Sequence, residues 1–294
     1  MSILPKLEEA GSIALESLKS FFSGEPFQLA AALSYYTMLS IAPLLLVMIG
    51  VSGFLLGEEQ VREALVMQVR DLVGDEGASL LQTVSQNVGT NDRNYVSMIV
   101  GFVLMVLGAT TVFAQLQTSL NRVWGVKAEP ANAILGFLRS RLLSLTVVLG
   151  LAFLLLVSLI FSAAISAFQT YLEGFLPGAD MIWTIANHAI SLVLVALLLA
   201  MLFRYVPDVE ISWRDTVIGA LVTATLLTLG KYAIGVYLGR AGVGSPYGAA
   251  GSAVVFMVWV YYVSLILFLG AEITKTIARH RGNPLRPSAH AKRI

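Results

Sequence analysis

Long apolar stretches separated by short polar segments dominate the pattern along the chain. A helix that crosses a membrane needs about 20 mostly apolar residues. Six stretches meet this requirement, at approximately 29–56, 96–118, 142–168, 182–203, 215–238 and 248–274. Beyond Asp215, which begins the fifth stretch, only Lys231 and Glu272 within them carry a formal charge. The pattern predicts an all-α fold, a six-span transmembrane helix bundle formed by residues 26–278.

Two amphipathic segments lie outside these spans. In residues 1–25, apolar positions recur at helical spacing but are interrupted by Glu16 and Lys19, which excludes the continuous apolar core of a signal peptide. This segment predicts an amphipathic N-terminal helix that lies on the membrane surface or caps the bundle. Residues 58–94 repeat the helical spacing and predict a helical outer loop, acting as a docking or gating element or as a solvated cap.

The distribution of basic residues predicts the orientation of the spans. Fourteen Lys and Arg residues flank the spans on the side of the two termini, and four flank them on the other side. Because basic residues accumulate on the cytoplasmic side, we expect both termini in the cytoplasm of a bacterium and the protein in its inner membrane. Residues 58–94 are then periplasmic, and residues 279–294 form a basic cytoplasmic tail.

The composition supports a membrane protein and narrows the chemistry. Hydrophobic residues make up 57% of the 294 residues and charged residues only 13%, about half the charged fraction of a soluble domain. The net charge of +1 gives no basic field that would indicate a nucleic acid partner. The chain has no cysteine, so disulfides, thiolate nucleophiles and cysteine metal ligands are excluded.

The first span is unusual because it carries small polar groups and a proline. Residues 29–46 read LAAALSYYTMLSIAPLLL. Pro43 removes one backbone N–H and kinks the span, so it is a candidate hinge or a static bend. Tyr36, and Gln115 in the second span, are candidate contacts to a substrate or lipid. Such intramembrane polarity fits a polar cavity and equally fits simple helix association.

Four segments together resemble a known family. They are AAALSYYTMLSIAPLLL, LNRVWGV at 120–126, RYVPDVEISWRDTVIGALVTATLLTLGK at 204–231 and YGAAGSAVVFMVWVYYVSLILFLGAEIT at 247–274. They occur in the order found in the YihY/BrkB family of bacterial inner-membrane proteins. The resemblance implies a polytopic protein of about six spans, and links to serum resistance and to envelope lipid or lipopolysaccharide. A ribonuclease BN label given to some members is generally regarded as a misassignment.

The residues themselves do not indicate an enzyme. The sequence has no HExxH motif, no Cys/His cluster and no phosphate-binding loop. Asp208, Glu210 and Asp215 could hold a cation, but they lie beside Arg204 and Arg214, so a salt-bridged turn is the simpler interpretation. We therefore expect no catalytic residues, no cofactor and no metal.

The two charges inside the spans are candidates for function or for structural pairing, since charged groups in a bilayer cost at least about 2.5–3.5 kcal/mol. At 1.5 Å per residue, Lys231 lies roughly 10 Å from the outer end of its span and Glu272 roughly 36 Å along the next, so they form separate sites. Lys231 faces a cavity, where it contacts an anionic lipid phosphate, or snorkels to the outer headgroups. His188 is a further candidate contact or a core histidine. Glu272 is expected to form a structural ion pair. The candidate partners are Lys275, Arg141, Arg204 and Arg122.

These observations predict a transporter-like protein that handles a lipid or other amphiphilic anion in envelope biogenesis. Membrane lipids are the expected partners, with an anionic lipid or a lipopolysaccharide precursor as the candidates. The alternative is a non-transporting scaffold that holds an envelope protein complex through residues 58–94. A membrane-bound hydrolase or nuclease is the third and least supported interpretation.

Overall fold

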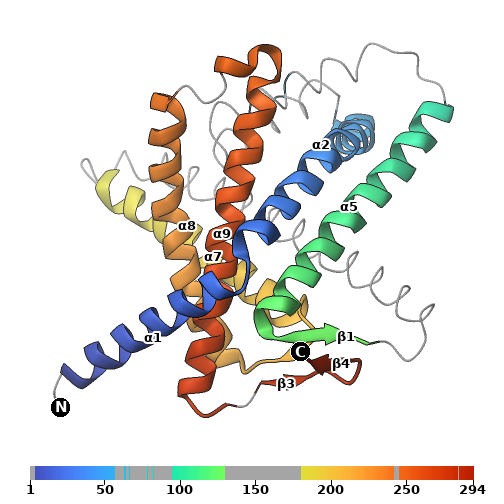
Figure 1. The fold of residues 1–294 in the computed structure, drawn as a ribbon. Helices are drawn as coiled ribbons and strands as arrows, with labels where there is room; N and C mark the ends of the chain where they lie inside the picture. Colours follow the sequence, from blue (N-terminus) through green and yellow to red (C-terminus); the bar gives the residue numbers. More distant parts are fainter. Residues whose placement is uncertain are drawn as a thin grey trace. The chain divides into compact units, whose positions relative to one another are not determined.

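The computed structural model describes residues 4–56, 95–129, 180–241, 245–283 and 285–294, together with Glu63, Val66, Ala78 and Gln82 (Figure 1). Most of these residues are helical, in agreement with the predicted fold class. The long helices are α1 (Leu4–Ser23), α2 (Pro26–Leu56), α5 (Tyr95–Trp124), α7 (Asp180–Tyr205), α8 (Trp213–Ala241) and α9 (Gly251–His280), and a short 3-10 helix spans Ser245–Ala250. The predicted span at 142–168 and the loop at 58–94, apart from those four residues, lie outside the described part of the chain.

Three segments of the described chain are long and apolar enough to cross a membrane: His188–Tyr205 in α7, Trp213–Tyr237 in α8 and Gly251–His280 in α9. They correspond to the fourth, fifth and sixth predicted spans. Helices α2 and α5 coincide with the first and second, but the count of six spans stays a prediction. Both α5 and α9 extend six residues beyond their predicted ends. The added turns are polar, and tertiary contacts keep them helical.

Glycines end two of these helices. Gly125 follows α5 with a φ of +68°, and its N–H donates to the carbonyl of Arg122. Gly282 follows α9 with a φ of +72°, and the next residue, Asn283, donates its N–H to the carbonyl of Ala278. Glycine adopts this left-handed conformation without the steric cost of a Cβ, so both positions allow a sharp stop and a turn into the following strand or loop.

The described chain forms two compact units. Unit 1 contains α1, the end of α5 from Gln117, α7, α8 up to Thr228 and the chain from Leu267 onward. Unit 2 contains α2, α5 up to Leu116, α8 from Leu229, the 3-10 helix and α9 up to Ile266.

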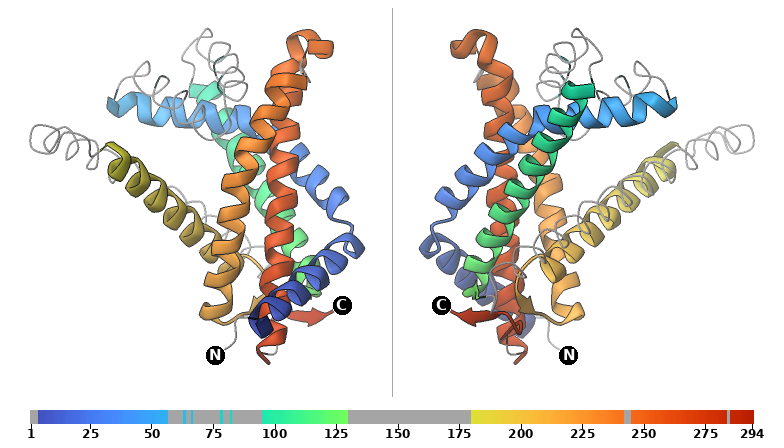
Figure 2. Two further views of the ribbon diagram at one scale, coloured as in Figure 1. Left: turned by 90° about the vertical axis from the view of Figure 1, so that its left-hand side faces the viewer. Right: turned by 90° about the vertical axis from the view of Figure 1, so that its right-hand side faces the viewer.

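Within unit 1, α8 and α9 run side by side and pack through a reciprocal glycine–threonine contact (Figure 2). Gly219 of α8 faces Thr274 of α9, and Gly270 of α9 faces Thr223 of α8. Thr223 and Thr274 are fully buried and donate their hydroxyls to the carbonyls of Gly219 and Gly270 on their own helices. Small residues allow two backbones to approach closely, which is how membrane helices associate without a hydrophobic driving force.

The C-terminal residues form two short antiparallel pairs in unit 1, which the sequence analysis did not predict. Strand β1 (Val126–Ala128) pairs with β4 (Ala291–Arg293) in the register Val126↔Arg293, and β2 (Val209–Glu210) pairs with β3 (Arg286–Pro287). Both pairings join residues more than 70 positions apart. Strands of two or three residues leave no alternating pattern in the sequence. The segment predicted as a basic tail is therefore folded back on the loops that follow α5 and α7.

Candidate functional site

The four residues predicted to contact a substrate or lipid do not all belong to one unit. Lys231, Tyr36 and Gln115 lie in unit 2, whereas His188 lies in unit 1. Lys231 and His188 are exposed on α8 and α7, and Tyr36 and Gln115 are half-buried on α2 and α5. No observation tests their function, so their role stays a prediction.

Lys231 lies on an apolar exposed surface of α8. Leu229, Tyr232 and Tyr237 on the same part of the helix are 63%, 61% and 56% exposed. The neighbouring Gly230 is instead buried against α9, where an added Cβ would lie 2.7 Å from the Tyr262 hydroxyl. α8 is thus held against α9 on one side and presents its lysine on another. Lys231 is thus an exposed basic residue beside large, exposed apolar side chains of α8.

Pro43 lies within α2, which continues without interruption to Leu56. Figure 2 shows that α2 bends along its length. The side chain of Pro43 lies outside the described residues. The bend agrees with the kink expected of an internal proline, and whether it works as a hinge stays a prediction.

Hydroxyl groups along the helices are used mainly for local hydrogen bonds. The following residues donate to the carbonyl four positions earlier: Thr37, Ser40, Thr111, Thr223, Thr225, Thr228, Ser264 and Thr274. Ser34 of α2 instead donates to the carbonyl of Met257 in α9, at 2.6 Å, within unit 2. The Ser34 bond is a contact of the kind expected from helix association, while the polar cavity stays a prediction.

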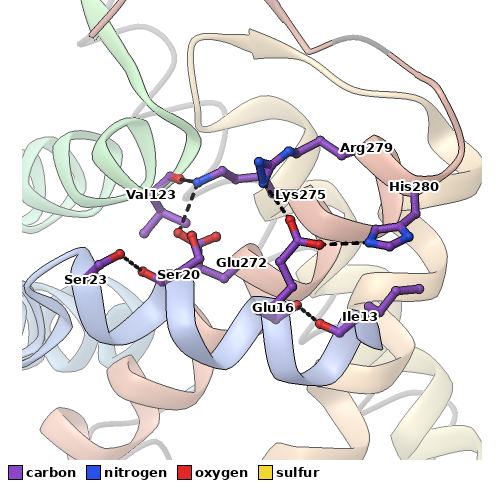
Figure 3. Close-up of polar contacts among 10 residues, drawn as sticks. Ile13, Glu16, Ser20, Ser23, Val123, Glu272, Lys275, Arg279 and His280 are labelled. Atoms are coloured by element: carbon purple, nitrogen blue, oxygen red, sulfur yellow. Dashed lines mark hydrogen bonds and ion pairs between the residues drawn. The ribbon is translucent and has the colours of Figure 1, made fainter. Parts of the chain in front are cut away.

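Glu272 is buried and forms an ion pair with Lys275, at 3.1 Å. The Lys275 ammonium also donates to the carbonyl of Val123, at 2.6 Å, in the last turn of α5 (Figure 3). The last carbonyls of a helix have no partner within it, and a cation there interacts favourably with the helix dipole. The pair therefore ties α9 to the end of α5. This agrees with the ion pair expected of Glu272, whose second carboxylate oxygen, Oε2, is buried without a hydrogen-bond partner.

Asp208 joins three parts of unit 1. Its carboxylate accepts from Asn121 Nδ2 at 2.8 Å and from Gln117 Nε2 at 3.3 Å, and its N–H donates to Asn121 Oδ1 at 2.7 Å. Its carbonyl accepts from the N–H of Ser288 at 3.0 Å. The polar end of α5, the loop after α7 and the C-terminal segment therefore meet at this residue.

The sequence predicted that Asp215 pairs with the arginines next to it, Arg204 and Arg214. The structure corrects this prediction. Asp215 is fully buried and accepts from Arg281 at 3.2 Å and from Asn283 at 2.7 Å, both beyond the end of α9. Arg204 instead lies over the ring of Trp213, 5.6 Å from its centroid. The carboxylate of Asp215 is paired, as expected, but the residues that pair with it lie more than 60 positions away in the sequence. Arg141 lies outside the described residues.

A last contact attaches α1 to the end of α9. The Glu16 carboxylate accepts from Arg279 at 3.1 Å and from His280 at 2.9 Å (Figure 3). The hydrogen bond with His280, together with the charge of Arg279, holds the pKa of Glu16 below its ordinary value despite some desolvation. In the sequence, the only sign of this contact is the acid that interrupts an apolar helix.

These contacts attach the helix ends and the loops of unit 1 to one another. Within the described ranges, no group of three or more His, Cys, Asp or Glu side chains could hold a metal ion. Several long apolar helices, tied together by polar contacts near the ends of α5 and α9, define an integral membrane protein.

The comparisons assign the protein to a family within this class. The chain belongs to the family described as Virulence factor BrkB, whose sequence profile matches residues 18–294. This confirms the resemblance drawn from the sequence motifs.

Individual relatives carry the name "UPF0761 membrane protein". The one from Chromobacterium violaceum is 28% identical over 88% of this chain, and the one from Rhodospirillum centenum is 26% identical over 95%. One from Stenotrophomonas maltophilia is 26% identical over 90%. The chain spans about 60% of the length of each of these three relatives. No solved structure matches it.

Proposed function

We propose that the protein is a transporter-like component of the bacterial inner membrane that handles a lipid or other amphiphilic anion in envelope biogenesis. The observation that supports this proposal is Lys231, an ammonium group on an exposed, apolar surface of α8. A charge at such a place is costly in hydrocarbon, and intramembrane ionisable residues commonly mark substrate paths. An anionic headgroup next to the lysine lowers that cost, and the surrounding leucine and tyrosine side chains suit an acyl chain.

The same proposal includes the topology. Six spans, cytoplasmic termini, an amphipathic α1 and a periplasmic helical loop at 58–94 place Lys231 nearer the periplasmic end of α8. The protein then works without a cofactor and without enzymatic chemistry, and nucleic acid is not a partner.

Lipid retention measured by native mass spectrometry tests the contact. The protein is released from nanodiscs of phosphatidylethanolamine and phosphatidylglycerol, and Lys231→Met is compared with the wild type. A basic residue near a membrane surface contributes about 1 kcal/mol to anionic-lipid attraction, so we expect roughly fivefold weaker phosphatidylglycerol retention. Lys231→Arg should recover part of it, because the planar guanidinium keeps the charge but differs in shape and hydration.

Lys127→Met is the matched control, because Lys127 is an exposed lysine on β1, outside the predicted spans. It should retain lipid as the wild type does. Unchanged phosphatidylglycerol retention in Lys231→Met would contradict the proposed contact. If, in addition, a periplasmic protein crosslinks to residues 58–94, the scaffold is the better account.

A further inference from the structure

Helix α1 presents an exposed apolar face and a buried face in the part whose side chains are described. Leu15, Leu18 and Phe22 are 57%, 44% and 57% exposed. Their spacing of three and four residues places them along one face of the helix. Ser17 and Phe21, four residues apart, are 0% and 7% exposed and form a second, buried face.

The rotation of α1 about its axis is fixed by contacts within unit 1. The buried face packs against the unit, and Glu16 is held by Arg279 and His280. The face formed by Leu15, Leu18 and Phe22 therefore points away from the rest of unit 1. A helix that only capped the bundle would bury its large apolar residues.

The chain next to α1 indicates what covers this face. α1 ends at Ser23 and the apolar α2 begins at Pro26, so only two residues separate them. At no more than about 3.6 Å per residue, the end of α1 lies within roughly 11 Å of the start of α2. Since α2 begins the membrane domain in the proposed topology, α1 starts at the membrane surface. Lys19, which is exposed one turn beyond Leu15, suits the anionic headgroups there.

We infer that the Leu15–Leu18–Phe22 face of α1 inserts into the cytoplasmic leaflet, while Glu16 fastens the opposite side of the helix to α9. The partner of this surface is the acyl region of a phospholipid leaflet, and anionic headgroups add attraction through Lys19. The inference rests on the topology in the proposed function, but not on Lys231 or on transport, because it concerns a different unit and a different helix. The N-terminal helix then combines the two predicted alternatives. One of its faces packs on the bundle, and another lies in the membrane surface.

Spin labels on the cysteine-free chain test this surface directly. Full-length Leu15→Cys, Leu18→Cys and Phe22→Cys, each labelled with a nitroxide, are reconstituted into vesicles of phosphatidylethanolamine and phosphatidylglycerol. Relaxation by oxygen, which concentrates in lipid, is compared with relaxation by a water-soluble nickel chelate. We expect high oxygen and low nickel accessibility at all three positions. Ser12→Cys, on the exposed polar side, should be accessible to nickel, and Phe21→Cys should be shielded from both reagents.

Each other outcome overturns the inference. High nickel accessibility at the three positions means that the face lies in water. Low accessibility to both reagents means that a protein covers it, either a second copy of the chain or another partner. Vesicles of phosphatidylcholine alone, which carry no net charge, separate the apolar contribution to insertion from the electrostatic contribution. Insertion through the apolar face should persist there, with nickel accessibility rising by less than twofold.

Discussion

The reciprocal contact between α8 and α9 allows a sharp prediction about stability. Gly219→Ala adds a Cβ that would lie 2.6 Å from the Cβ of Thr274 and 3.0 Å from its Cα, with the Thr274 hydroxyl closer still. Real Cβ atoms almost never come within 3.0 Å of another heavy atom, and one of the obstructing atoms belongs to the backbone. A rotamer change therefore cannot relieve the contact, and the two helices must move apart.

The expected cost follows from the response of packed cores to added methyl groups. Overpacking of this kind typically destabilises a protein by about 1–3 kcal/mol. Gly270→Ala should have a similar effect, because its added Cβ would lie 2.7 Å from the Cβ of Thr223. The assay is the Tm of the purified protein in mild detergent, followed by fluorescence-detected size-exclusion chromatography after heating. Both variants should unfold several degrees below the wild type.

Gly235→Ala is the control on the same helix. An added Cβ at Gly235 has no heavy atom within 4 Å, and alanine favours a helix over glycine by up to about 1 kcal/mol. Its Tm should match or exceed that of the wild type. The double variant Gly219→Ala with Thr274→Ala should lose somewhat less than the two single losses combined, because the closest clash, with the hydroxyl, is removed while the clash with the Cβ of residue 274 remains. Equal Tm values for Gly219→Ala and Gly235→Ala would refute the packing argument.

Three further predictions concern the first span, the topology and α1. Pro43→Ala should leave folded protein in the membrane but reduce lipid exchange if the proline is a hinge; a parallel fall in Tm would make it structural. A cysteine at position 85 should react with a membrane-impermeant maleimide in intact spheroplasts, whereas labelling only after permeabilisation would invert the proposed topology. Because the pKa of Glu16 is lowered from 4.5 in the folded protein, its contact with His280 stabilises α1 above that pH and is lost as the pH falls through the lowered pKa. A nitroxide at Ser20 should gain mobility on such acidification, and unchanged mobility would exclude this attachment.

For the long helices that the structure describes, the sequence was sufficient because their signal is local. An apolar run of about 20 residues has few structural alternatives in a membrane, where the backbone must satisfy its own hydrogen bonds. The predicted starts of α2 and α5 therefore lie within three residues of the observed ones. The Glu272–Lys275 ion pair could also be predicted from the sequence, since residues three apart on a helix are neighbours.

The tertiary polar contacts could not be predicted in the same way. Asp215 was assigned to the arginines beside it in the sequence, whereas its partners are Arg281 and Asn283. A buried carboxylate is stabilised by whichever donors the fold brings to it, and sequence proximity carries little weight. The glycine–threonine contact was missed for a related reason, because a small residue in a helix looks the same whether it faces lipid or another backbone.

Lys231 shows what a span alone leaves open. Its depth could be derived from residue counts, but the side of α8 on which it lies could not. The structure places it on an exposed surface, next to a glycine that packs on α9. Whether Lys231 faces a cavity or the outer surface of the bundle stays a prediction.

Lipid exchange between leaflets is the most direct test of the proposed function. The purified protein is reconstituted into vesicles with a trace of fluorescent phosphatidylglycerol, and dithionite bleaches the label in the outer leaflet. The account predicts that wild-type protein and Lys127→Met expose label from the inner leaflet faster than protein-free vesicles do, and that Lys231→Met loses most of this activity. Bleaching that stops at the outer-leaflet fraction with wild-type protein, as in protein-free vesicles, would contradict transport of an anionic lipid.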